Sequence, residues 1–88
     1  MKALYTDVEI LEILGEKVKQ LRSSRKQTQQ ELADFCGVSR RTIVLFEQGQ
    51  GIGLLSFIRI LRYFDLEQEM LHIIPEHRDI DPFNPQTL

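Results

Sequence analysis

Apolar residues recur every three or four positions along residues 7–24, which predicts an amphipathic helix with one buried face. The positions on that face are Leu11, Leu14, Val18 and Leu21. Gly15 lies within the pattern and is expected to weaken the helix by about 1 kcal/mol relative to Ala. The polar stretch that follows Ser24 breaks the period, so we expect the helix to end near that residue.

A second, shorter helix is predicted over residues 29–36. Thr28 and Glu31 form the capping-box pattern, in which each side chain bonds the backbone amide of the other residue. Gly37 then supplies the left-handed conformation that often ends a helix. The residues expected to be buried in this helix are Leu32, Ala33 and Cys36.

A third helix follows almost at once, because one residue separates that glycine from Ser39, a good N-cap residue. Val38 and Ile43 stand at the two positions of a hydrophobic staple, and Ile43 with Phe46 forms the inward face. Two short helices joined by so tight a turn are typical of a helix-turn-helix, which we place at about residues 28–48.

Two further helices are predicted before the chain becomes irregular. One covers residues 54–64, the other covers residues 66–74, and Asp65 separates them. Prolines from position 75 onward exclude a regular helix and predict an extended tail over residues 75–88. The inward residues of the fourth helix are expected to be Leu54, Phe57, Ile58, Leu61 and Phe64. The chain is thus predicted to be all-α, with five helices in one domain.

Length and composition fit one soluble domain and exclude other classes of protein. The 88 residues are 42% hydrophobic and 27% charged, close to the averages for soluble domains. No apolar run approaches the roughly 18 residues that span a bilayer. Acidic residues occupy the N-terminal stretch where a signal peptide would be apolar, so we expect a cytoplasmic protein with no membrane partner.

The side chains that could carry chemistry predict neither a metal site nor catalysis. Cys36 is the one cysteine, so it cannot form an internal disulfide. His72 and His77 show no spacing typical of zinc ligands. No Ser-His-Asp order and no paired carboxylates support an enzyme. We therefore expect no metal, no cofactor and no enzymatic activity.

Charge is segregated along the chain although the formal net charge is only -2. Residues 15–50 carry seven Lys and Arg against four Asp and Glu, whereas residues 51–88 carry three against six. A basic middle segment suits contact with DNA phosphates, and a solvated surface of mixed charge is the alternative.

Residues 14–49 contain the stretches LGEKVKQLR and TQQELADFCGVSRRTIVLFEQG, which resemble the DNA-binding domain of the lambda-repressor-like, or XRE, family of helix-turn-helix regulators. The pattern T-Q-x-E-L-A, then G-V-S, then I-x-x-x-E-x-G carries the resemblance, which extends less tightly to about residue 74. It implies a five-helix lambda-repressor-like domain over residues 1–74 that binds double-stranded DNA.

The resemblance also implies roles for individual residues. Arg22 and Glu47 occupy the positions of a buried pair that holds the first helix to the end of the third. The residues expected to contact bases are Gln29, Ser39, Arg40, Arg41, Val44 and Leu45. The residues expected to contact phosphates are Lys19, Lys26, Thr28, Gln48 and Gln50.

The positions of Arg40 and Arg41 in the third helix give a separate reason to expect contact with bases. Positive side chains in the first turn of a helix oppose the helix macrodipole, so a purely structural role is locally unfavourable. Arginine pairs with O6 and N7 of guanine, and we favour base contact over a solvated surface for at least one of the two. Val44 and Leu45 lie on the same side as Arg41, with additional core packing as the alternative. Leu45 stands where related repressors often carry a polar residue, which indicates contact with thymine methyl groups.

The C-terminal residues indicate a more specific function than DNA binding alone. The stretch IIPEHRDIDPFNP resembles the endings of antitoxins encoded beside HipA-type kinase toxins, which implies an antitoxin that represses its own operon and holds a kinase-like toxin. One recognition helix covers a half-site, so we expect a homodimer on an inverted-repeat operator. We expect the fourth and fifth helices to form it, with part of the tail packed across the interface or on a toxin, and a monomer with a disordered end is the alternative. The expected dimer or partner surface is Met70, Leu71, Ile73, Ile74, Ile80 and Phe83. The alternatives are a phage-type or restriction-controller regulator without a toxin, and a protein-interaction module in which DNA binding is secondary.

Overall fold

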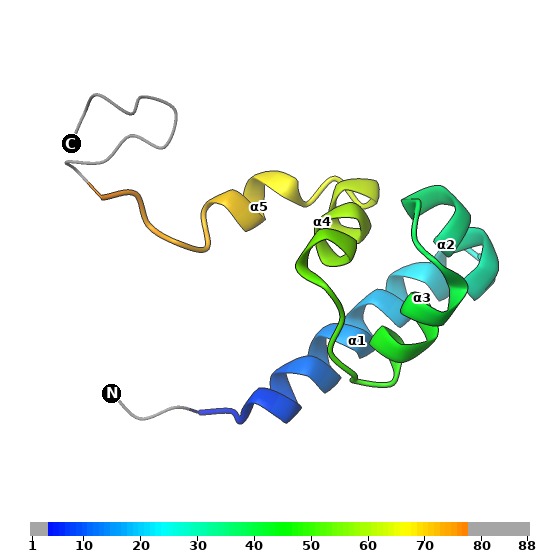
Figure 1. Cartoon of the computed structure of the whole chain (residues 1–88), viewed down its shortest axis with the longest axis horizontal. Coiled ribbons are helices and arrows are strands. Elements are labelled where there is room, and N and C mark those ends of the chain that lie inside the picture. Colours follow the sequence, from blue (N-terminus) through cyan, green and yellow to red (C-terminus); the bar gives the residue numbers. More distant parts are fainter. Residues whose placement is uncertain (1–3, 78–88) are drawn as a thin grey trace.

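The computed structural model describes residues 4–77, and within this range the chain forms five α-helices and no β-strand (Figure 1). The helices are α1 (Asp7–Ser24), α2 (Gln29–Cys36), α3 (Arg40–Glu47), α4 (Leu54–Tyr63) and α5 (Glu67–Leu71). The all-α prediction is confirmed. No helix among these residues is both long enough and apolar enough to cross a lipid bilayer.

Local sequence signals explain where the first three helices begin. Thr6 and Thr28 each start a capping box, in which the Thr oxygen accepts from the amide three residues later and the Glu at that position accepts from the Thr amide. Ser39 accepts a hydrogen bond from the amide of Thr42 at 3.1 Å. Gly37 ends α2 in the left-handed conformation with φ 73°. The predicted caps of α2 and α3 are therefore confirmed.

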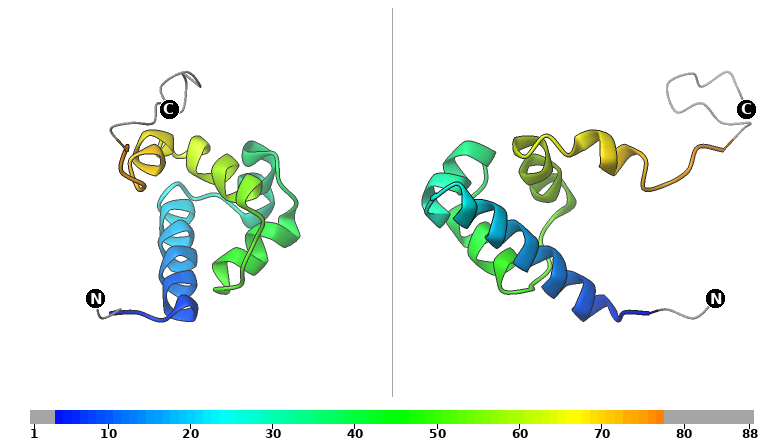
Figure 2. Two further views of the ribbon diagram at one scale, coloured as in Figure 1. Left: turned by 60° about the vertical axis from the view of Figure 1, so that its left-hand side comes forward. Right: turned by 180° about the vertical axis from the view of Figure 1, so that it is seen from behind.

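The core lies where α1, α2, α3 and α4 meet. Figures 1 and 2 show α1 lying along α3, α2 beside α3, and α4 over α2. The buried apolar residues are Val18, Leu32, Ala33, Cys36, Ile43, Phe46, Ile60 and Phe64. Because both α1 and α4 pack against the α2–α3 pair, the position of α3 is fixed from more than one side.

Gly15 is the point of closest contact between α1 and α3. A Cβ at this position would lie 2.1 Å from the carbonyl oxygen of Phe46, a separation that no real side-chain carbon tolerates. The two helices therefore approach to a distance that only glycine permits. The sequence-based interpretation, in which Gly15 simply weakens its helix, missed this requirement.

Two of the predicted inward faces need correction. Leu21 is 37% exposed and Leu54 is 70% exposed, although both were expected to face the core. In the last turn of α1, Arg22 is the residue that reaches α3, so Leu21 lies at the edge. Ile60 is fully buried although it was not predicted to face inward. Apolar residues occur on nearly every side of α4, so packing against α2 decides which of them is buried.

The fifth helix is shorter than predicted, since α5 ends at Leu71 rather than at Ile74. It packs mainly against α4, and so short a helix has little stability of its own. Residues 72–77 continue without regular structure and are exposed. Ile80 and Phe83, with most of the predicted extended tail, lie outside the described residues.

Candidate nucleic-acid interface

A turn of three residues, Gly37 to Ser39, joins α2 to α3. The amides of Gly37 and Val38 both donate to the carbonyl of Ala33, at 2.9 and 3.1 Å. Val38 packs against the core cluster that contains Ile43, as the predicted staple requires. The end of α2 and the start of α3 are thus both fixed, which is the geometry of a helix-turn-helix.

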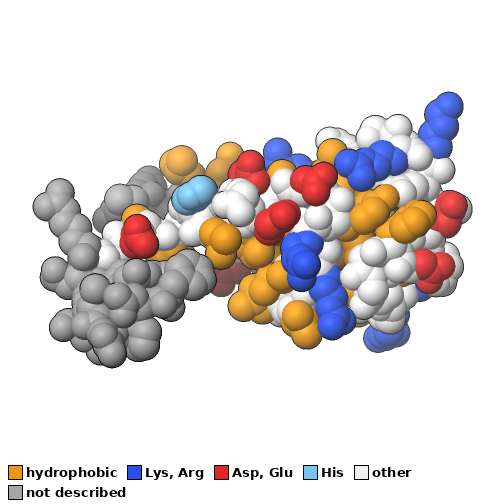
Figure 3. Space-filling model, turned by 90° about the horizontal axis from the view of Figure 1, so that it is seen from above, with side chains coloured by type: hydrophobic (Ala, Val, Ile, Leu, Met, Phe, Trp, Pro, Cys, Tyr) orange, Lys and Arg blue, Asp and Glu red, His pale blue; other side chains and the backbone are white. Residues whose placement is uncertain are grey.

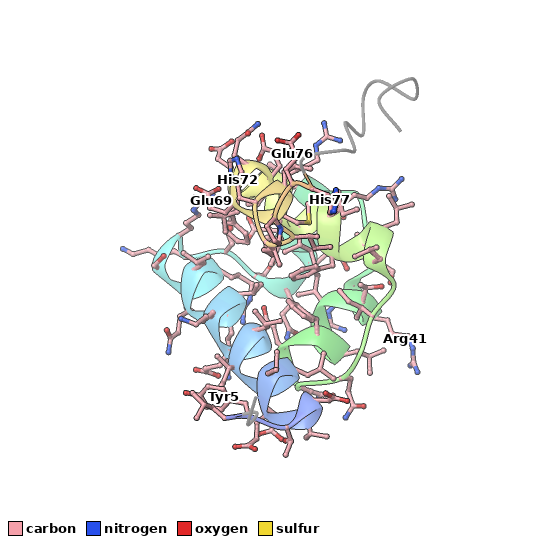
Figure 4. The ribbon with its side chains drawn as sticks, turned by 90° about the vertical axis from the view of Figure 1, so that its left-hand side faces the viewer. Tyr5, Arg41, Glu69, His72, Glu76 and His77 are labelled. Atoms are coloured by element: carbon pink, nitrogen blue, oxygen red, sulfur yellow. The ribbon has the colours of Figure 1, made fainter. Side chains whose placement is uncertain are left out.

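The outer side of α3 carries the predicted recognition residues. Arg40 and Arg41 are exposed, and Figure 4 shows Arg41 extending away from the body of the molecule. Neither arginine forms an ion pair within residues 4–77. Val44 and Leu45 follow Arg41 by three and four positions and are half-buried, but they do not belong to the core cluster. The side of α3 that faces solvent therefore combines free guanidinium groups with apolar carbon.

Two of the hydroxyl groups expected to contact DNA already bind within the protein. Ser39 Oγ accepts from the Thr42 amide and lies 2.9 Å from Thr42 Oγ1. Thr28 Oγ1 accepts from the Glu31 amide at 3.0 Å. Because a hydroxyl accepts and donates independently, the Thr28 hydrogen remains available for a phosphate oxygen.

Arg22 and Glu47 form the predicted pair between α1 and the end of α3. Arg22 Nε and Nη2 donate to the two carboxylate oxygens of Glu47 at 2.7 and 2.9 Å, a bidentate arrangement. The side chains are only 13% and 3% exposed. The hydrogen bonds to Glu47 raise the pKa of Arg22 above its ordinary value, so this guanidinium stays charged. Arg22 Nη1 also donates to the carbonyl of Gln27 at 2.8 Å.

Gln29 joins this network, which sequence reasoning did not anticipate. Its Nε2 donates to Glu47 Oε1 at 3.1 Å. The predicted base-contacting glutamine is therefore positioned at the start of α2 by the same carboxylate that binds Arg22. Its side-chain carbonyl oxygen has no such partner within residues 4–77 and can accept a hydrogen bond from DNA.

The residues expected to contact phosphates lie on the surface at three places. Lys26 and Thr28 flank the start of α2, and Gln48 and Gln50 follow the end of α3, where all four are exposed. Lys19 is exposed on α1. Lys26 has a φ of 56°, a conformation that is strained for a residue with a side chain.

A second cluster, of aromatic rings and polar groups, was also not anticipated. Phe35 of α2 stacks on Tyr63 of α4, with ring centroids 5.5 Å apart and planes within 12°. The Tyr63 hydroxyl accepts from Gln27 Nε2 at 2.5 Å. The Arg25 guanidinium lies over the rings of Tyr63 and Phe64, at 5.4 and 4.8 Å from their centroids. These residues are up to 39 positions apart, so no local pattern indicates the cluster.

Cys36 lies in the core as a small apolar residue, and burial raises the pKa of its thiol to about 11. A thiol with so high a pKa is a poor nucleophile at neutral pH. In the part of the chain that the structure describes, no group of three His, Cys, Asp or Glu side chains is placed to hold a metal ion.

Comparison with known proteins points to the same part of the chain. A family model described as helix-turn-helix matches residues 18–67, more than half of the sequence. Two curated proteins, each called "Putative HTH-type transcriptional regulatory protein", are similar over 53 residues, with 38% identity in Methanospirillum hungatei and 42% in Methanoregula boonei. In both cases the similarity covers 60% of this chain and 17% of the relative, so this chain matches one segment of a longer protein.

Proposed function

The chain belongs to the helix-turn-helix family of the XRE type, and we propose that it is a sequence-specific DNA-binding regulator of transcription, acting as a repressor in the cytoplasm. The proposal rests on two arginines on the outer side of α3. Two arginines at the first turn of this helix are exposed and have no carboxylate partner within residues 4–77. Positive charge at a helix N-terminus is intrinsically unfavourable, so an anionic partner from outside the chain would stabilise it.

In the proposed complex, α3 lies in the major groove with Arg40 and Arg41 toward the base edges. Arginine binds guanine through O6 and N7, which gives sequence preference. Val44 and Leu45 contact thymine methyl groups, because they offer carbon and no hydrogen-bonding atoms. Gln29 adds its carbonyl oxygen from the start of α2.

The remaining contacts are to the DNA backbone and determine affinity rather than sequence preference. Lys19 and Lys26 supply charge, while Thr28, Gln48 and Gln50 supply neutral donors. Lys26 and Thr28 lie at one end of the helix-turn-helix and Gln48 and Gln50 at the other, so these four would set the orientation of α3 in the groove.

A homodimer on an inverted repeat is the second element of the proposal. Leu71, Ile73 and Ile74 are exposed apolar residues at the end of α5, and Ile74 is 80% exposed. Met70 is half-buried beside them. So many neighbouring exposed apolar side chains favour an interface. Ile80 and Phe83, which the sequence also assigns to this surface, lie outside the described residues.

The most specific form of the proposal is an antitoxin that represses its own operon and binds a kinase-like toxin. It rests on the sequence of the C-terminal residues, whose resemblance to such antitoxins is short. A phage-type or restriction-controller regulator without a toxin shares every feature of the DNA-binding surface. Copurification of a kinase-like protein with the full chain would separate the two regulators.

Selection from a random duplex library with the full chain tests the DNA-binding proposal. We expect enrichment of an inverted repeat whose half-site centres are about 34 Å apart, or a multiple of one helical turn. Binding to the enriched sequence should weaken steeply with salt, with a slope of about -0.9 for each phosphate neutralised. Enrichment of no sequence, with only weak binding at low salt, would instead favour a protein-interaction module.

A further inference from the structure

A shallow hollow at the C-terminal ends of α2 and α4 combines aromatic rings with two arginines that form no ion pair within residues 4–77. It is lined by Phe35, Cys36, Arg59, Arg62 and Tyr63 and has a volume of about 380 Å³. Phe35 is 63% exposed although its other face stacks on Tyr63. We call Phe35, Arg59, Arg62 and Tyr63 the arginine–aromatic patch. The outer side of α3, which we assign to DNA, does not contribute to it.

The charge of this patch is not neutralised within residues 4–77, where Arg22–Glu47 is the one ion pair. Arg59 donates a single hydrogen bond, at 3.2 Å, to the carbonyl of Gly37. Arg62 is exposed on the following turn of α4. Seen from above in Figure 3, Lys and Arg side chains lie beside hydrophobic ones on the helical part of the molecule. A fitting ligand would therefore supply both carboxylates and an apolar ring.

The chain itself contains such a ligand in residues 79–83, Asp-Ile-Asp-Pro-Phe, which we call the acidic arm. In an extended segment, alternate residues lie on one side about 6–7 Å apart. Residues three apart on a helix, such as Arg59 and Arg62, have Cβ atoms about 5–6 Å apart. Pro82 favours the extended conformation for the preceding Asp81. The spacing of Asp79 and Asp81 thus suits the spacing of the two arginines.

The acidic arm of the same copy is badly placed to reach this patch. Figures 1 and 2 show α5 and the residues after it leaving α4 on the side opposite α2. The described chain therefore ends at His77 on the side of α4 opposite the patch. We expect a second copy to present its arm to the patch more directly.

We infer that the acidic arm of one copy docks on the arginine–aromatic patch of a second copy, with Asp79 and Asp81 on Arg59 and Arg62 and with Phe83 against Phe35. The inference rests on the proposed homodimer and identifies the receiving surface. When each copy gives its arm to the other, the contacts close a two-fold dimer and leave no free patch.

Charge-reversal variants of the full chain test this arrangement by sedimentation equilibrium. The arm variant is Asp79→Lys with Asp81→Lys, and the patch variant is Arg59→Glu with Arg62→Glu. Each should raise the dissociation constant of the dimer about ten-fold or more, because both exchanged contacts become repulsive. A matched control, Glu12→Lys with Glu16→Lys, makes the same charge change as the arm variant on the exposed surface of α1 and should leave the constant unchanged.

Mixing the two variants is the decisive measurement. In a mixed dimer the lysine arm meets the glutamate patch and the aspartate arm meets the arginine patch, so both contacts are complementary again. We expect the mixture to associate within about three-fold of the wild-type constant while each variant alone associates weakly. A mixture no better than either variant alone would overturn the inference, as would a wild-type chain that stays monomeric at high micromolar concentration.

The arginines of the patch could instead contact DNA phosphates, and the same variants decide this. Loss of DNA affinity in the patch variant, with unchanged self-association, would overturn the docking of the arm. If the wild-type chain selected no DNA sequence but the mixture still restored the dimer, the proposed regulator function would fail while the arm exchange would stand. Circular dichroism melts check that the patch variant folds, and the arm variant tests the contact without altering any described residue.

Discussion

The inner and outer sides of α3 use arginine in opposite ways. On the inner side, Arg22 reaches across from α1 and binds both oxygens of Glu47, and little of either side chain meets solvent. On the outer side, Arg41 extends into solvent with no carboxylate partner in the described part of the chain. The difference comes from the surroundings, because the same residue type holds helices together only where a buried carboxylate faces it.

This comparison separates two kinds of effect on DNA binding. Substitutions on the inner side should act through the stability and position of α3. Substitutions on the outer side should act through direct contacts and leave stability unchanged. The experiments below test that separation, beginning with the largest expected effect.

Removing either member of the buried pair should destabilise the fold most. We expect Arg22→Ala and Glu47→Ala each to lower the free energy of unfolding by about 3–5 kcal/mol, because each leaves its partner's charge buried and unpaired. For a domain of this size, each kcal/mol corresponds to a shift of about 4–8 °C in Tm. Thermal melts measure the change, and exposed Glu16→Ala on α1 serves as the control. Melts within a degree of wild type for both variants would show that the pair is not structural.

Gly15→Ala should also destabilise the protein, against the usual trend. In most helices this change stabilises by up to about 1 kcal/mol. Here the new Cβ would meet the Phe46 carbonyl oxygen, so we expect a loss of about 1–3 kcal/mol as α1 and α3 are forced apart. Gly51→Ala is the matched control, since nothing lies within 4 Å of its added Cβ. Urea unfolding of the two variants gives the comparison, and equal stabilities would contradict the close contact.

On the outer side, Arg41→Ala and Arg40→Ala should weaken DNA binding without changing Tm. Loss of a base contact should reduce affinity by about 1–3 kcal/mol and relax the preference at one operator position. Lys19→Ala should instead weaken binding to all sequences alike and reduce the salt slope. Mobility-shift titrations at two salt concentrations distinguish these results. If the arginine variants bound the selected sequence as tightly as wild type, the prediction that α3 contacts the bases would be wrong.

The smallest expected effect concerns Cys36 of α2, in the core against which the inner side of α3 packs. Its folded-state pKa of about 11 lies above the ordinary value of 9.0, because burial disfavours the thiolate. This contribution to stability is therefore complete below pH 9.0 and is lost as the pH rises toward about 11. Urea unfolding at pH 8 and pH 10.5 should show a smaller alkaline loss in Cys36→Ala than in wild type. Equal losses in the two proteins would indicate that the thiol is accessible in the folded state.

Features that depend on neighbouring residues could be predicted from the sequence. The capping box at Thr28, the left-handed Gly37 and the N-cap Ser39 each lie within three residues of the groups that they bind, so their pattern is visible in the chain. For this reason the sequence predicts where the two helices of the helix-turn-helix begin and where α2 ends. The Arg22–Glu47 pair spans 25 positions, and only the resemblance to a known family indicated it.

Features that depend on how helices meet could not be predicted in this way. Gly15 is required by a carbonyl of α3, and nothing near it in the sequence reveals that carbonyl. Ile60 is buried because α2 packs against that side of α4, whose apolar residues are spread over several sides, so hydrophobic periodicity did not select it. Gln29 was expected to face DNA, but its bond to Glu47 depends on packing between α2 and α3. The DNA contacts themselves remain predictions.

The close contact at Gly15 holds only the C-terminal end of α3, so that end is a pivot about which the rest of the helix can tilt. Phe46 and Glu47, at the C-terminal end of α3, rest on the main chain and side chains of α1, whereas Arg40 and Arg41 are at the other end. The eight residues of α3 span about 12 Å, so a tilt of about 10° at the pivot would displace the arginine end by about 2 Å. A hydrogen bond to a base edge does not survive such a displacement. A methyl group added at the pivot would therefore misplace guanidinium groups that it never touches.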